Sequence, residues 1–69
     1  MSIEEKRKAF RYHLRKIARS TDEDEVNVNN MWAMTCAYNM KSYVSAKEYI
    51  DMVATVNAFT WKAKRKLLS

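Results

Sequence analysis

Apolar residues recur along the first part of the chain with the period of an α-helix. At about 100° per residue, one narrow stripe collects the apolar side chains Ile3, Phe10, Leu14 and Ile17. Ser2 stands three residues before Glu5, which is the spacing of a capping box, in which each residue's side chain bonds the other's backbone amide. The pattern therefore predicts an amphipathic helix over residues 3–19.

The start of a second helix is harder to place. The acidic run from Asp22 to Glu25 suits the positive end of a helix dipole, and either Ser20 or Thr21 can act as the cap. The next residues, 26–30, are poor helix material because Asn and β-branched residues have low helix propensity. Two starts therefore remain open, near residue 21 and near residue 29, and the helix is expected to end near residue 43. Its expected apolar side consists of Val28, Met31, Trp32, Thr35, Tyr38 and Tyr43.

A second capping box, formed by Ser45 and Glu48, predicts a third helix over residues 46–67. Its last turns carry Lys62, Lys64, Arg65 and Lys66, which favour the negative end of the helix dipole. The connections between the helices are short, so neighbouring helices should lie roughly antiparallel. The expected fold is all-α, a small three-helix bundle that forms a single domain over residues 1–69.

The chain contains no Gly and no Pro. Tight hairpins rely on Gly for positive φ, and the common phosphate-binding loops are Gly-rich, so strand hairpins and those nucleotide sites are excluded. Cys36 is the single cysteine and His13 the single histidine, which excludes an intrachain disulfide and a cysteine-rich zinc site. No metal or other cofactor is expected.

The third helix carries more apolar surface than one core requires. A helix packed on a single core needs a stripe a little over about 100° wide, and the apolar arc is roughly twice that. In one interpretation the other two helices cover both sides of the arc. In the other, part of the arc meets a second chain, most simply in a two-fold homodimer. The residues predicted for that self-association are Met52, Val56, Phe59 and Ala63.

The net charge of +5 is unevenly distributed. On the first helix, cations within about 120° of one another are Arg7, Lys8, Arg11, Arg15 and Arg19. With the C-terminal cluster Lys62, Lys64, Arg65 and Lys66, they form the predicted partner-binding basic face. In one interpretation the acidic run pairs with part of this face and the rest is solvated. In the other, the face meets an anionic partner, either nucleic acid or an acidic protein surface.

Neither candidate catalytic side chain carries a convincing pattern. His13 borders the apolar stripe between cations, and Cys36 lies among apolar residues, where cysteine behaves as a small hydrophobe. The carboxylates cluster at a helix start, where capping and the helix dipole account for them. An enzyme is therefore not expected.

Several features bear on location and function. The N-terminal ten residues are charged and lack the apolar stretch of a signal peptide, and no apolar run approaches the ~20 residues of a membrane span. We therefore expect a cytoplasmic chain without a membrane partner.

The expected function is a non-enzymatic regulator, a helical homodimer that binds a larger cellular protein and inhibits or redirects it. The alternative is a small nucleic-acid-binding protein. The lack of Gly and Pro, with many Lys, Asn and Met, resembles compact accessory proteins of phages and mobile elements.

Overall fold

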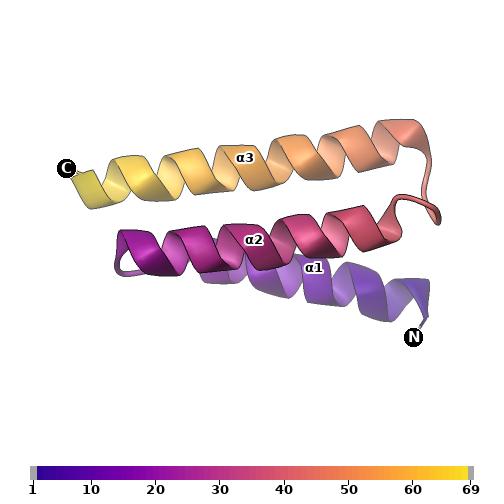
Figure 1. Ribbon diagram of the computed structural model, residues 1–69, viewed down its shortest axis with the longest axis horizontal. Coiled ribbons are helices and arrows are strands. Elements are labelled where there is room, and N and C mark those ends of the chain that lie inside the picture. Colours follow the sequence, from indigo (N-terminus) through magenta and orange to yellow (C-terminus); the bar gives the residue numbers. More distant parts are fainter. Residues whose placement is uncertain (1, 69) are drawn as a thin grey trace.

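A computed structural model describes residues 2–68 and places them in three helices. The helices are α1 (Ile3–Ala18), α2 (Glu23–Met40) and α3 (Ala46–Leu68), and the described part of the chain contains no strand. Successive helices reverse direction, so α1 and α3 run the same way and their C-terminal ends lie at one end of the bundle (Figure 1). The predicted all-α three-helix bundle is confirmed.

Two of the helix starts carry the predicted serine caps, which are one half of each predicted capping box. The Ser2 hydroxyl accepts a hydrogen bond from the Glu5 backbone N–H at 3.2 Å. The Ser45 hydroxyl accepts one from the Glu48 N–H at 3.1 Å. Each bond satisfies one of the backbone donors that a helix leaves unpaired at its first turn.

The cap of α2 differs from both residues proposed for it. Asp22 is the cap, and its Oδ1 accepts a hydrogen bond from the Glu25 N–H at 2.8 Å. The Glu25 carboxylate turns back to accept bonds from the Thr21 N–H at 3.0 Å and the Thr21 hydroxyl at 2.9 Å. The acidic run is therefore the first turn of α2, and a helix start near residue 29 is wrong. The hydrogen bonds that the Asp22 and Glu25 side chains make stabilise this helix start. They outweigh the weak helix propensity of residues 26–30.

The core is small and formed by all three helices. Its buried apolar residues are Phe10, Leu14 and Ile17 of α1, Val26, Ala33, Ala37 and Met40 of α2, and Met52, Val56 and Ala63 of α3. The predicted apolar stripe of α1 is thus confirmed. Three of the residues predicted for self-association, Met52, Val56 and Ala63, pack inside the same chain, so that prediction is wrong about them. The cause is that α1 and α2 cover this part of the wide apolar arc.

The orientation of α2 is the reverse of the one predicted. The residues expected in the core are exposed, among them Val28, Met31, Trp32 and Tyr38, with exposed fractions from 50% to 67%. α2 packs against both α1 and α3 more extensively than those two pack against each other. Small side chains at Ala33 and Ala37 allow this close approach. Because α2 is apolar on both sides, hydrophobic periodicity alone could not identify the side that is buried.

One polar side chain belongs to the buried side of α2. Asn29 is only 8% exposed. Its amide nitrogen donates hydrogen bonds to the Glu25 carbonyl at 2.9 Å and to the Ser20 hydroxyl at 3.5 Å. A buried polar group that is hydrogen-bonded in this way is tolerated in a core. Asn29 also ties α2 to the turn that precedes it.

Candidate functional site

The predicted basic residues of α1 fall into two classes. Arg7 is engaged within the chain, because its guanidinium lies 3.1 Å from the Glu48 carboxylate of α3. Lys8, Arg11, Arg15 and Arg19 are exposed. None of these four forms an ion pair with another residue in the range 2–68. The acidic run at the start of α2 therefore leaves this row of cations without carboxylate partners.

Helical spacing places Arg11 and Arg15 along the seam where α1 meets α3. Arg7 contacts α3 through Glu48, and Ala18 lines a depression shared with α3. Positions 7, 11, 15 and 18 follow one another at helical spacing on one edge of α1, so the two arginines lie between these two contacts. We call this surface the basic seam. It comprises Lys8, Arg11, Arg15, Arg19, Lys62 and Lys66.

An open apolar depression of about 380 Å³ lies at the C-terminal end of the basic seam. It is lined by Ala18, Ala58, Phe59, Lys62, Ala63 and Lys66. The side chain of Phe59 is 37% exposed and is the one large apolar side chain in the lining, which also includes three alanines. Phe59 is thus the one predicted self-association residue that stays accessible, and it lies among cations. The arrangement can accept an apolar side chain that is flanked by negative charge.

The C-terminal cations that the sequence grouped together point in different directions. Lys62 and Lys66 belong to the basic seam. Lys64 lines a small depression on the α2 side together with Glu23. The guanidinium of Arg65 lies 4.6 Å from the ring centroid of Trp61, a cation–π arrangement. Arg65 also lines an open depression of about 340 Å³ with Trp61, Lys62 and Lys66, so it borders the basic seam. Lys64 is therefore the member of the predicted C-terminal cluster that lies apart from the seam.

A second surface is the outward side of α2, which the sequence pattern predicted to be buried. We call it the apolar face and define it by Val28, Met31, Trp32, Thr35 and Tyr38. Residues 26–40 contain no charged side chain. A shallow groove between α2 and α3, lined in part by Met34 and Ile50, borders this face. Absence of charge over four turns of helix is the signal that could have identified it.

His13 packs among aromatic rings. It stacks on Trp32 with the ring centroids 6.0 Å apart, and it meets Tyr12 edge-on at 5.2 Å. Among residues 2–68, the buried Nδ1 of His13 has no hydrogen-bond partner, so it makes no hydrogen bond to Cys36. This packing is that of a structural histidine. A Cys–His dyad, in contrast, requires hydrogen-bond reach between the two side chains.

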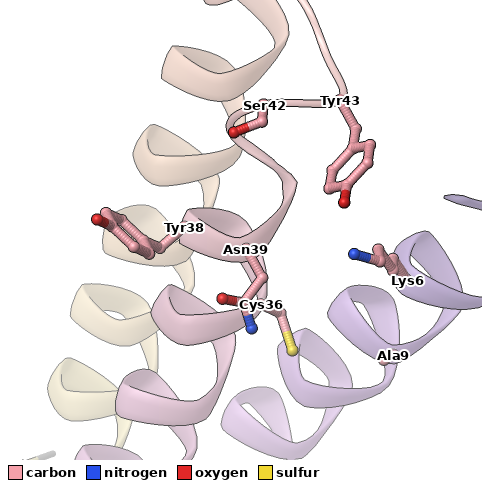
Figure 2. A pocket seen from close by; sticks show the side chains of 7 residues that line it. All are labelled: Lys6, Ala9, Cys36, Tyr38, Asn39, Ser42 and Tyr43. Carbon is pink, nitrogen blue, oxygen red and sulfur yellow. The ribbon is translucent and has the colours of Figure 1, made fainter. Parts of the chain in front are cut away.

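Cys36 lines an open depression of about 630 Å³ between α1 and the end of α2 (Figure 2). The Lys6 ammonium and the Tyr43 ring point toward one another across it, 4.1 Å apart, and the Cys36 sulfur points toward Ala9 of α1. Burial raises the pKa of the Cys36 thiol. A nucleophilic cysteine needs the opposite shift, because the thiolate is the reactive form. This depression therefore lacks the electrostatics of a cysteine active site.

Within residues 2–68, no three His, Cys, Asp or Glu side chains are grouped so that they could hold a metal ion. No helix of that range is long and apolar enough to cross a bilayer.

Comparison of the chain with protein-family models, with curated proteins and with solved structures gave no match in any of the three.

Proposed function

We propose that this chain is a non-enzymatic regulatory protein that binds a larger protein through the basic seam and thereby inhibits or redirects it. The observation that carries the proposal is the exposed row of Arg11, Arg15 and Arg19 beside an apolar depression formed around Phe59. Arginine's planar fork binds carboxylates in a bidentate manner. The matching partner surface presents an apolar side chain between aspartates or glutamates.

The depression favours a protein partner over nucleic acid. A phosphate backbone offers charge and sugar, and it has no protruding aliphatic or aromatic side chain to fill a hollow lined by Phe59 and alanines. Binding energy at protein interfaces is concentrated where an apolar anchor enters such a hollow, with charges at the rim. The basic seam and the depression at its end together supply both elements.

Nucleic-acid binding is the second candidate, and one observation favours it. Lys8, Arg11, Arg15, Arg19 and Lys62 have no ion-pair partner among residues 2–68, so their charge is available to phosphates. Phosphate contacts release counterions, and the affinity therefore falls steeply as salt rises. Nucleic-acid binding with that salt dependence, and with no protein partner, would select this second function.

The decisive experiment is capture of partners by the tagged chain from a nuclease-treated lysate, followed by reconstitution with the purified partner. Wild-type protein is compared with a double variant, Arg11→Glu with Arg15→Glu. The control is Lys16→Glu with Lys47→Glu, two exposed cations outside the basic seam. Each reversal removes two units of charge, so both double variants change the net charge from +5 to +1. We expect the seam variant to lose the partner and the control to keep it.

Two results would contradict the proposal. One is unchanged binding by the seam variant, which would assign the row to solvation. The other is equal loss in both variants, which would mean that net charge alone matters. A further variant tests the depression: Ala58→Trp fills it with an exposed side chain, while Ala58→Ser leaves it open. The tryptophan substitution should abolish capture of an acidic protein and leave any nucleic-acid binding nearly unchanged.

A further inference from the structure

The apolar face of α2 has the spacing of a helix-packing surface. Val28, Met31, Thr35 and Tyr38 follow one another at intervals of three, four and three residues. This alternation places side chains in one row that can interdigitate with the same row of another helix. Val28 is 50% exposed, Met31 66% and Tyr38 67%, so the row is uncovered within a single chain.

Thr35, the one polar side chain in the row, can be buried without leaving its hydroxyl donor unpaired. The Thr35 hydroxyl donates a hydrogen bond to the Met31 carbonyl of its own helix at 2.9 Å. Its donor is therefore satisfied without water, and its methyl group is left for packing. Covering the row with another apolar surface would leave no Thr35 donor unpaired.

A single copy leaves most of its aromatic surface outside the core. Of the eight Phe, Trp and Tyr side chains, which all lie in the described range, only Phe10 is buried. The core has ten apolar residues, and three of them are alanines. Chains of this length bury a small fraction of their surface and are commonly stabilised by association with another chain. The exposed aromatics are the surface that such an association would use.

We propose that the occupant of the apolar face is a second copy of this chain, with the two α2 helices packed antiparallel about a two-fold axis. The inference goes beyond the proposed function, because it concerns a different face and a different partner. In such a dimer the centre of the row coincides with the axis, so Met31 of each copy lies opposite Thr35 of the other. Closed two-fold dimers are the commonest oligomers of soluble proteins.

The charges at the two ends of α2 fit a second copy in this orientation. α2 begins with the exposed carboxylates of Glu23 and Asp24 and ends beside the exposed Lys41. Antiparallel packing brings the acidic start of each helix against Lys41 of the other copy, and it also opposes the two helix dipoles favourably. The basic seam lies between α1 and α3, so the two rows of like charge stay apart.

The available area is of the required order. A standard interface covers about 800 Å² on each partner, which is about a sixth of the chain's exposed surface of 5082 Å². The large exposed side chains on or beside this face are Val28, Met31, Trp32, Tyr38 and Ile50. Each is at least half exposed, and an aromatic side chain alone can bury about 150–250 Å².

Sedimentation equilibrium on the full chain tests the dimer directly. We expect a mass of twice 8.2 kDa at micromolar concentration. Met31→Glu should shift the protein to 8.2 kDa without loss of helical circular dichroism, because Met31 contributes nothing to the core. Arg11→Glu, a charge change on the basic seam, should stay dimeric. A wild-type protein of 8.2 kDa at all concentrations, or a dimeric Met31→Glu variant, would overturn the proposal.

A charge-swap experiment tests the orientation and excludes other arrangements. Asp24→Lys alone and Lys41→Glu alone each place like charges at both ends of the helix pair. Each should raise the dimer dissociation constant roughly tenfold, because two symmetric pairs are affected. The two substitutions together restore opposite charges and should return the constant to near its original value. Additive weakening in the double variant would rule out antiparallel α2 packing.

Discussion

The guanidinium of Arg7 and the carboxylate of Glu48 form an ion pair at 3.1 Å that joins α1 to the first turn of α3. The sequence pattern predicts other roles for both residues. Glu48 was expected to close a capping box with Ser45, and Arg7 to extend the basic face. In the structure the Glu48 amide still meets the Ser45 hydroxyl, while its side chain turns to Arg7. Arg7 is therefore a structural contact rather than part of the basic seam.

We expect this ion pair to contribute little to the free energy of unfolding. The side chains are 37% and 38% exposed, so solvent screens their attraction. A double-mutant cycle with Arg7→Ala and Glu48→Gln should give a coupling below about 1 kcal/mol. Urea denaturation of the four proteins measures it. A coupling above about 2 kcal/mol would show that the pair acts as a buried one.

The cap of α2 gives a sharper prediction. Asp22→Ala removes the acceptor of the Glu25 N–H, and loss of such a cap typically costs about 1 kcal/mol. Asp22→Asn is the matched control, because it keeps a side-chain oxygen that can accept the Glu25 N–H. Thermal or urea unfolding should show Asp22→Ala to be clearly less stable than Asp22→Asn. Equal stability of the two variants would contradict the role of Asp22 as the cap.

Two valines on α2 test which side of the helix is buried. Val26 is fully buried and Val28 is 50% exposed. Val26→Ala removes two carbon atoms from the core and should cost roughly 2 kcal/mol, including the cavity that it leaves. Val28→Ala should change stability by less than about 0.5 kcal/mol in protein dilute enough that self-association does not contribute. Equal losses would contradict the observed orientation of α2.

The buried side could be predicted from the sequence for α1 but not for α2. α1 was predicted correctly because one of its sides is apolar and the other charged, so its period identifies the buried stripe. α2 has uncharged residues on both sides, and the large side chains Trp32 and Tyr38 suggested a core that Ala33 and Ala37 in fact provide. The core of this bundle requires close approach of three helices, which favours small side chains. That requirement arises only from the tertiary arrangement.

The candidate site could be predicted only in part for a related reason. The row of cations on α1 follows from helical spacing within one segment, and its exposed members are placed as expected. The meeting of Ala18 with Phe59 and Lys62 depends on how α1 packs against α3, residues about 40 positions apart. No local pattern encodes that contact. Likewise, Lys64 lies apart from Lys62 because it faces the start of α2, where it lines a depression with Glu23.

The carboxylate of Glu25 predicts a pH dependence at the start of α2. The hydrogen bond from the Thr21 backbone N–H, followed by that from its hydroxyl, lowers the pKa of Glu25. The unfolded chain lacks these bonds and so binds the proton more tightly. Their stabilisation is therefore complete above the ordinary glutamate pKa of about 4.3 and is lost as pH falls through the lowered value. NMR titration of Glu25 in folded and urea-unfolded protein should show the lower pKa in the folded state, together with a shift of the Thr21 amide signal.

The proposed function involves no covalent chemistry, so the Cys36 thiol should react slowly in the folded protein. Burial raises the pKa of its thiol, and only the thiolate reacts with iodoacetamide. At neutral pH, alkylation of the folded protein should be slower than alkylation of the protein unfolded in urea, and it should accelerate as pH rises past the ordinary cysteine range of about 8.5. Mass spectrometry of timed samples measures both rates. Cys36→Ser should in addition leave partner capture unchanged, because Cys36 lies on neither the basic seam nor the apolar face. Rapid alkylation of the folded protein at neutral pH, combined with loss of function in Cys36→Ser, would instead indicate an activated nucleophile and contradict a purely binding role.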